Sequence, residues 1–179
     1  MFRPLWTCLT CALLLIASNA KAEDRVATFP KISTKNLNDR PATFPAGLPG
    51  KRSLVLIAFK RDQQSKLDVW IEKLKLKQPD APAWIEMPVV ADYGSIWRAF
   101  VDNGMRSGIK TTRARSHVFT VYGDQQEFLA KLNLPTTNMV YVLVVQQDGR
   151  VLARADGIYS ATKAKPLLKA MSSGTKAPR

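Results

Sequence analysis

The chain contains two cysteines, and their spacing is that of a motif with known redox chemistry. They stand as Cys8-Leu9-Thr10-Cys11, the C-x-x-C pattern of thiol–disulfide exchange. The pair lies inside an apolar stretch from Leu5 to Ala17, which is followed by Ala20-Lys21-Ala22. A basic start, an apolar stretch and an A-x-A site are typical of a secretory signal peptide. The pattern predicts that residues 1–22 are removed, and both cysteines with them. An uncleaved membrane anchor is the alternative interpretation.

Few side chains in the rest of the sequence could carry out other catalytic chemistry. Without cysteine there is neither a disulfide nor a thiolate nucleophile. The single histidine, His117, would have to serve alone in a metal site or a catalytic triad, and a structural role in a strand is the favoured interpretation. The carboxylates lack metal-ligand spacing, and no glycine-rich phosphate loop occurs. We therefore expect no metal, no cofactor and no enzymatic activity.

Cationic side chains are the remaining candidates for a site. One group surrounds the predicted start of a helix, whose N-terminal end adds partial positive charge, and another lies in a later basic stretch that also holds Lys110. If the two groups converge, they would form a surface for an anionic partner; independent solvated charges are the alternative. With one proline, discussed below, the candidate binding residues are Lys60, Arg61, Lys66, Arg106, Arg113, Arg115 and Pro135.

The composition is that of one globular domain with a strong excess of positive charge. The chain has 179 residues, of which 46% are hydrophobic and 23% charged. Residues 1–22 contain two cations and no carboxylate, so their removal lowers the net charge from +13 to +11. Such a protein could favour anionic lipid or an acidic protein, although a merely solvated surface is equally compatible. Nucleic acid is unlikely, because aromatic residues such as Trp97 and Phe100 fall on apolar helix faces rather than between cations.

Hydrophobic periodicity predicts alternating strands and helices. Apolar runs at 54–59 and 139–145 are typical of central strands, and Asp148-Gly149 predicts a tight hairpin leading to a strand at 151–155. Further strands are expected at 83–90 and 116–122. A helix over 62–77 has an apolar face that includes Trp70, and a second helix from residue 95 to Asn103-Gly104 has its apolar face at Ile96, Trp97, Phe100 and Val101. Shorter helices are expected after Asp124 and over 160–171.

This order predicts an α/β fold of the thioredoxin-like class, with a mixed central sheet flanked by helices. We expect an irregular lead-in over 23–50, the domain over 51–172 and a polar tail over 173–179. In a thiol redoxin the C-x-x-C opens the helix after the first central strand, where this chain has Lys60 to Leu67. Pro135 precedes a central strand, where redoxins often carry a cis-proline; a proline that ends the preceding helix is the favoured interpretation.

Four segments carry a resemblance to a known family. They are LVLIAF at 54–59 with Trp70 in the following helix, GMRSGI at 104–109, HVFTVYGD at 117–124, and LNLPTTNMVYVLVVQQDGRVLARADG at 132–157. Together they resemble the thioredoxin-like ATP-synthase assembly-factor family, over about Pro41 to Met171. The resemblance implies a chaperone for a proton-channel subunit of the membrane sector. Two features depart from it: the mitochondrial members act on the matrix side, whereas this chain has an export signal, and its hairpin ends RADG without the tryptophan that often stands there.

The sequence therefore predicts an exported protein, periplasmic in a Gram-negative host. Its expected function is that of a thioredoxin-like chaperone or assembly factor for a membrane-associated complex. The expected partner is a protein client, with an anionic lipid surface as a second partner. The alternative is a periplasmic redoxin-like protein that binds an anionic small molecule in the former active-site pocket.

Overall fold

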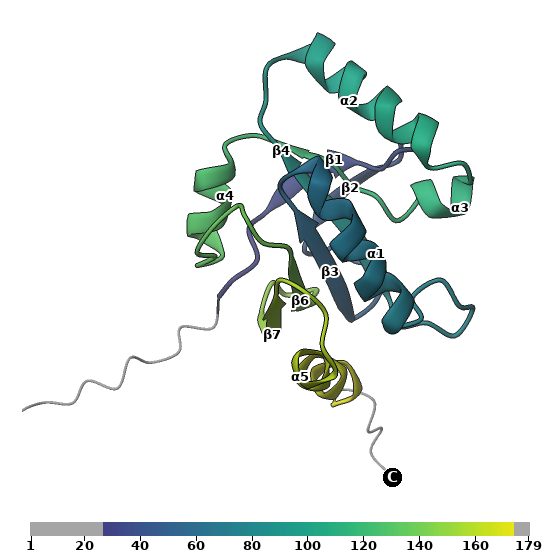
Figure 1. The fold of residues 1–179 in the computed structure, drawn as a ribbon. Coiled ribbons are helices and arrows are strands. Elements are labelled where there is room, and N and C mark those ends of the chain that lie inside the picture. Colours follow the sequence, from purple (N-terminus) through teal and green to yellow (C-terminus); the bar gives the residue numbers. More distant parts are fainter. Residues whose placement is uncertain (1–26, 174–179) are drawn as a thin grey trace, which may run out of the picture.

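A five-stranded sheet forms the centre of the molecule (Figure 1). The computed structural model describes residues 27–173, and the predicted signal peptide with its two cysteines lies outside them. The sheet has the order β5-β4-β3-β6-β7, and a separate hairpin pairs β1 with β2. The strands are β1 (Ile32–Lys35), β2 (Pro41–Phe44), β3 (Arg52–Ala58), β4 (Trp84–Val90), β5 (Val121–Tyr122), β6 (Tyr141–Gln146) and β7 (Val151–Asp156). The helices are α1 (Gln64–Lys73), α2 (Ser95–Gly108), α3 (Thr112–Arg115), α4 (Gln125–Lys131) and α5 (Ala161–Ser172).

The two apolar runs form the central strands, as predicted. β3 lies parallel to β4, with Leu54 opposite Trp84, and antiparallel to β6, with Leu54 opposite Val144. Both faces of β3 and β6 are covered, which explains why these segments are apolar without alternation. The predicted hairpin is confirmed: β6 and β7 are antiparallel, and Gly149 in the turn has φ of +94°.

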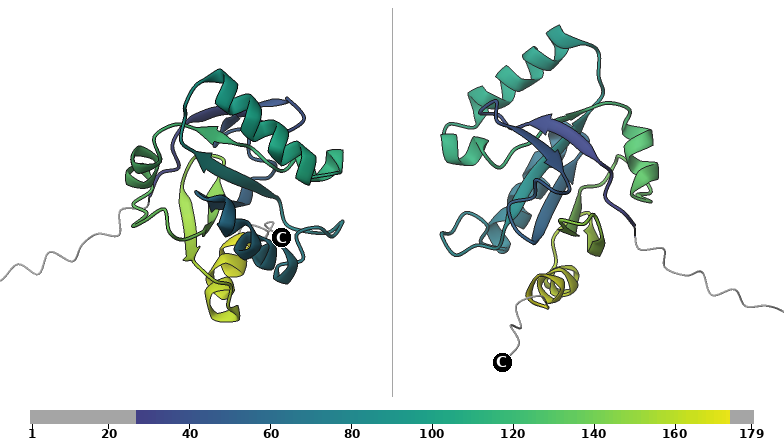
Figure 2. Two further views of the ribbon diagram at one scale, coloured as in Figure 1. Left: turned by 45° about the horizontal axis from the view of Figure 1, so that its top comes forward. Right: turned by 180° about the vertical axis from the view of Figure 1, so that it is seen from behind.

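Each face of the sheet carries its own hydrophobic core. On one face, α1 and α5 cover the sheet, and the indole of Trp70 is fully buried while its Nε1 donates to the Gly157 carbonyl oxygen at 3.0 Å. On the other face, Phe29, Phe44 and Phe128 pack against the apolar side chains of β3, β4 and β6. Figure 2 shows the β1–β2 hairpin lying behind the sheet, opposite α1. The result is a layered α/β molecule of the predicted class.

The lead-in is more regular than its four prolines indicate. Thr28 bridges to Arg150 beside β7, and Asn36 bridges to Phe119 ahead of β5, so this segment crosses one face of the sheet from one edge to the other. On the way, β1 and β2 pair antiparallel, and the peptide bond between Phe44 and Pro45 is cis. The prolines are compatible with this hairpin because it is not part of the central sheet.

Several element boundaries differ from the predicted ones. α1 ends at Lys73, and the strand expected over 116–122 is reduced to β5, with isolated bridges from Val118 and Phe119. α2 does not end at Asn103-Gly104 but continues to Gly108. A glycine inside a helix costs only about 1 kcal/mol, which neighbouring turns can offset.

Candidate binding edge

The carboxyl ends of the parallel strands β3, β4 and β5 lie at one edge of the sheet, which we call the binding edge. Open α/β sheets bind ligands outside such an edge. Here it consists of a 3₁₀ turn over Arg61–Gln63 that leads into α1, the segment after β4, and the segment from β5 into α4. The loop before β6 reaches the same place through hydrogen bonds to Lys60 and Gln63.

Gln63 joins these segments from inside the protein. Its side chain is buried, and its Oε1 accepts from the backbone N–H groups of Phe59 at 2.9 Å and Lys60 at 3.3 Å. Its Nε2 donates to the Thr137 carbonyl oxygen at 2.6 Å. Gln125 has a similar role, because its Nε2 donates to the carbonyl oxygens of Phe59 at 3.0 Å and Val89 at 2.7 Å. The two amides hold the ends of β3 and β4 and the loop before β6 in fixed positions.

The predicted cations at the start of α1 have different environments. The Lys60 ammonium donates to Asn138 Oδ1 at 2.6 Å, so this lysine contacts the loop before β6. Arg61 is exposed on the 3₁₀ turn, and Lys66 is half-buried one turn into α1. Lys60 and Arg61 are thus the cations that the structure places at the binding edge.

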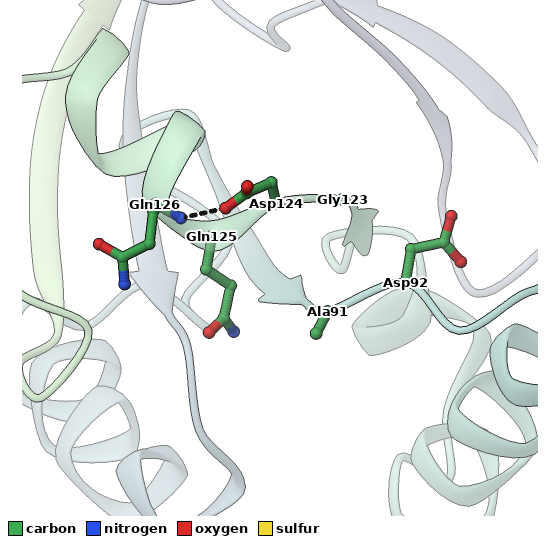
Figure 3. Close-up of a pocket in the computed structure, with 6 residues that line it drawn as sticks. All are labelled: Ala91, Asp92, Gly123, Asp124, Gln125 and Gln126. Atoms are coloured by element: carbon green, nitrogen blue, oxygen red, sulfur yellow. Dashed lines mark hydrogen bonds between the residues drawn. The ribbon is translucent and has the colours of Figure 1, made fainter.

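A hollow of about 580 Å³ lies at the ends of β4 and β5, at the same edge of the sheet (Figure 3). Its lining consists of Ala91, Asp92, Gly123, Asp124, Gln125 and Gln126. Gln125 connects the hollow to the end of β3, because its amide contacts Phe59 directly before Lys60. Carboxylates therefore line the hollow, and Lys60 and Arg61 follow the end of the neighbouring strand β3.

The two carboxylates of the hollow are already engaged. Asp124 caps α4: its Oδ1 accepts from the N–H groups of Gln126 at 2.7 Å and Glu127 at 3.3 Å, as the spacing predicted. Asp92 pairs with Arg98 on α2, and this hydrogen bond, helped by one from the Gly94 N–H, lowers the pKa of Asp92 to about 2. Asp92 is therefore ionised under all physiological conditions.

The later cations of the sequence do not converge with Lys60 and Arg61. The Arg106 Nε donates to the Leu37 carbonyl oxygen at 2.9 Å, and Arg115 donates to the Ile109 carbonyl oxygen at 2.7 Å. His117, two residues after Arg115, stacks on Trp84, the first residue of β4. Because β4 has seven residues at about 3.3 Å each, that end lies roughly 20 Å from the binding edge. Arg106 and Arg115, with Arg113 on α3, therefore gather at the opposite end of the sheet.

Pro135 is not a cis-proline, since Phe44–Pro45 is the one cis bond within residues 27–173. It also does not end α4, which finishes at Lys131. The helix is ended by Asn133 in the left-handed region, and the Leu134 N–H donates to the Leu129 carbonyl oxygen at 2.9 Å. Pro135 itself is exposed in the loop that leads to β6.

The predicted apolar face of α2 is wrong in its orientation. Ile96 is 87% exposed and Phe100 is 70% exposed, whereas Asp102 is buried. The helix lies outside the layers of the sheet, at the top of Figure 1. Periodicity identified the stripe correctly, but only packing could show which side of the helix faces the protein.

Two further findings concern cofactors and membranes. Within residues 27–173, no group of three or more histidine, cysteine, aspartate or glutamate side chains could hold a metal ion. No helix in the same range is long and apolar enough to cross a membrane. The ring of His117 packs against Trp84, and its Nδ1 lies 3.1 Å from the Trp84 carbonyl oxygen, which is a structural environment.

Comparisons with known proteins identify the fold but no family. No family model matches the chain, and no curated protein matches its sequence. Similar solved structures include the exposed lipoprotein thioredoxin Etrx1 of Streptococcus pneumoniae, with a TM-score of 0.52 and 12% identity over 78% of this chain and 98% of that one. BsSco, of the Sco family of cytochrome c oxidase assembly proteins, has a TM-score of 0.56 and 13% identity over 86% and 96%.

A third neighbour is the thioredoxin domain of a thiol-disulfide oxidoreductase from Bacteroides vulgatus, with a TM-score of 0.51 and 14% identity over 82% and 97%. Such neighbours contradict the prediction that this chain is not an enzyme, because redox enzymes share its fold. Nothing in the comparisons points to an ATP-synthase assembly factor. The predicted fold class is confirmed: the chain has the thioredoxin-like fold, a mixed central sheet flanked by helices.

Proposed function

We propose that this chain is an exported thioredoxin-like chaperone or assembly factor that binds a protein client of a membrane-associated complex at the binding edge. The observation that carries the proposal is the mixed charge of this edge. Lys60 and Arg61 follow β3, and the carboxylates of Asp92 and Asp124 line the hollow at the ends of β4 and β5. A polypeptide can offer amides and charges of both signs, so it fits this surface better than a ligand of a single charge.

Support for an assembly role comes from outside the site. One neighbour, BsSco, is described as a member of a family of cytochrome c oxidase assembly proteins. The predicted signal peptide would bring the chain to the outer side of a membrane, and the net charge of +13, or +11 after cleavage, favours an acidic client. The resemblance to ATP-synthase assembly factors makes the membrane sector of that enzyme one client to test.

The alternative function, binding of an anionic small molecule, receives less support. The hollow is lined by two carboxylates and by no cation, and carboxylates repel an anion. The cations that were expected to complete an anionic site lie about 20 Å away at the other end of β4. An anion would therefore meet only Lys60 and Arg61.

Site-specific crosslinking in the native host tests the proposal. A photoreactive residue at position 126 in the hollow should capture a client from gently solubilised membranes. A photoreactive residue at position 165, on the exposed side of α5, is the matched control. The double variant Lys60→Glu/Arg61→Glu should reduce capture about tenfold or more, whereas Lys165→Glu/Lys169→Glu, with the same charge change, should not.

Mass spectrometry of the captured proteins identifies the client. ATP-synthase membrane-sector subunits would support the finer family resemblance, and another envelope complex would support an assembly role with a different client. Equal capture from both positions would contradict the binding edge as the site. A thermal shift with inorganic phosphate that is lost in Lys60→Ala/Arg61→Ala, without client capture, would favour the small-molecule alternative instead.

A further inference from the structure

The outer side of α2 gathers three of the six exposed large apolar side chains of the described residues. Tyr93, just before the helix, is 76% exposed, Ile96 is 87% exposed and Phe100 is 70% exposed. The ring of Trp97 packs against both neighbours, with centroids 5.7 Å from Tyr93 and 5.8 Å from Phe100. Apolar groups gathered in this way mark an interaction surface rather than ordinary surface scatter.

The inner side of α2 explains why this apolar surface cannot simply turn inward. Tyr122 donates its hydroxyl to the buried Asp102 carboxylate at 2.6 Å. Arg106 binds both the Leu37 carbonyl oxygen at 2.9 Å and the Asp39 carboxylate at 3.0 Å. Rotating the helix would break these polar contacts and would leave the Tyr122 hydroxyl and the Leu37 carbonyl oxygen without these partners. The outward orientation is therefore built into the fold.

The outer face, as we call the exposed side of α2, is also free of charge. All three charged residues of the helix are held elsewhere: Arg98 by Asp92, Asp102 by Tyr122 and Arg106 by Asp39. The members of the outer face are exposed and uncharged; they are Ile96, Ala99, Phe100, Asn103, Gly104, Ser107 and Gly108. An anionic membrane or an acidic partner would be met by cations. A face without charge does not repel a partner that is itself strongly basic, such as a second copy of this chain.

The order of large and small residues makes this face complementary to itself. Ile96, Phe100, Gly104 and Gly108 follow one ridge at four-residue spacing, with the bulky pair at one end and the glycines at the other. A two-fold axis at the level of residue 102 brings Phe100 of one copy over Gly104 of the other, and Ile96 over Gly108. A Cβ at either glycine would meet nothing within 4 Å, so both positions are open to a partner.

We propose that two copies of this chain form a dimer through the outer faces of antiparallel α2 helices, with Phe100 of each copy seated over Gly104 of the other. Association buries the aromatic patch and keeps two basic molecules in contact where neither carries charge. The dimer does not rest on the proposed client function, because its contacts are made by Tyr93 and α2, and none of these residues lines the hollow.

The available area indicates a dimer of moderate strength. Aromatic side chains bury about 150–250 Å² each when fully enclosed. Tyr93, Trp97 and Phe100 from two copies, with Ile96, therefore bring the interface near the lower limit of roughly 1,000 Å² for specific association. Interfaces near this limit are weak or transient, so the oligomeric state should depend on concentration over about 1–100 µM.

Sedimentation analysis of the exported chain over that concentration range tests the dimer. The wild type should shift from monomer to dimer. Phe100→Ser removes the large side chain, and Gly104→Arg fills its seat and adds like charge near the axis; each should leave a folded monomer whose melting temperature is not lowered. The control is Ser172→Arg, because Ser172 is exposed in the last turn of α5, at the opposite end of the molecule from α2 (Figure 1). A monomeric wild type at all concentrations, or a dimer in all three variants, would overturn the proposal.

A single cysteine tests the geometry of the pair. Helix rise of 1.5 Å per residue places the two copies of residue 103 about 3 Å apart along the axis, so Asn103→Cys should crosslink under oxidation. Gly108→Cys should not, because the same rise separates its two copies by about 18 Å, and crosslinking at residue 108 would contradict the antiparallel arrangement. Residues 27–173 contain no native cysteine, and mass spectrometry of the N-terminus should be used first to check that Cys8 and Cys11 have been removed.

A membrane surface is the competing occupant, and fluorescence separates it from a second copy. Trp97 reports on the outer face because it is half-buried on α2, whereas the side chains of Trp70 and Trp84 are buried, with 0% and 7% of their surface exposed. Vesicles containing anionic phosphatidylglycerol should leave the emission of the chain unchanged. A blue shift with these vesicles that Phe100→Ser abolishes, in a chain that sediments as a monomer, would overturn the dimer in favour of the membrane.

Discussion

Single polar side chains determine how the ends of the central strands are held together. Gln63 satisfies the N–H groups of Phe59 and Lys60 while donating to the Thr137 carbonyl oxygen. A buried amide with three partners is costly to remove, because each partner group loses its hydrogen bond without gaining water. At the residue scale, this network is what shapes the binding edge.

Gln63→Ala should therefore lower the free energy of unfolding by about 2–3 kcal/mol, since it leaves buried backbone groups unpaired. Urea unfolding monitored by circular dichroism measures the change. Gln126→Ala removes an amide of the same type from an exposed position nearby and should change stability by less than about 0.5 kcal/mol. Equal effects of the two substitutions would contradict the connecting role of Gln63.

The ion pair at the start of α2 predicts a specific titration. Hydrogen bonds from Arg98 and from the Gly94 N–H lower the pKa of Asp92 from 3.8 to about 2. A lowered pKa in the folded state stabilises the protein above about pH 4, and this contribution disappears as the pH falls from about 4 towards 2. NMR titration should show the pKa of Asp92 rising towards its ordinary value in Arg98→Ala. An unchanged low pKa in that variant would show that Arg98 is not its cause.

At the scale of elements, α2 is attached by polar contacts rather than by a hydrophobic core. Hydrogen bonds from Trp97, Tyr122 and Arg106 join it to the segment after β4, to β5 and to the turn between β1 and β2. A helix without an apolar inner face depends more on its own propensity than a packed helix does. Substitutions inside it should therefore act mainly through helix stability.

Gly104→Ala should raise the free energy of unfolding by about 0.5–1 kcal/mol, because alanine is the better helix former and its Cβ meets no neighbour. Thermal unfolding at a concentration below dimer formation measures the gain. Gly149→Ala is the contrasting variant: φ of +94° and the nearby Pro45 side chain should make it destabilising. A loss of stability in Gly104→Ala would show that α2 packs differently.

At the scale of the whole molecule, β3 joins the two cores. Its side chains alternate between the face covered by α1 and α5 and the face covered by the lead-in and α4. The folded state therefore depends on this strand from both sides, and the molecule should unfold as one unit.

Leu56→Ala should lower the free energy of unfolding by about 2–5 kcal/mol, because it opens a cavity beneath α1 at a position with no solvent exposure. Chemical unfolding at low protein concentration gives the value. Ile96→Ala removes a similar volume from an 87% exposed position and should have almost no effect on the monomer. A large effect of Ile96→Ala at that concentration would contradict the exposed orientation of α2.

Segments whose structure follows from local pattern were predictable from the sequence. The apolar runs of β3 and β6, the Asp148-Gly149 turn and the face of α1 with Trp70 all have the predicted structure. The Asp124 cap of α4 was also predictable, because its partners are two and three residues away. At the binding edge, Lys60 and Arg61 were named correctly as neighbours of the α1 start. Gln63 and Gln125 were missed because an amide shows its role only through distant partners.

The sequence by itself determined the central strands β3 and β6, the hairpin from β6 to β7, the absence of cysteine from residues 27–173 and the excess of cations, since these depend on residue type and short-range spacing. The tertiary structure alone decided that Arg106 and Arg115 lie at the opposite end of β4 from Lys60, and that Ile96 and Phe100 face outward. The physical reason is the same in both cases. Periodicity shows that a stripe or a group of charges exists, but its direction depends on which distant polar partners, such as Tyr122 and Leu37, hold the other side.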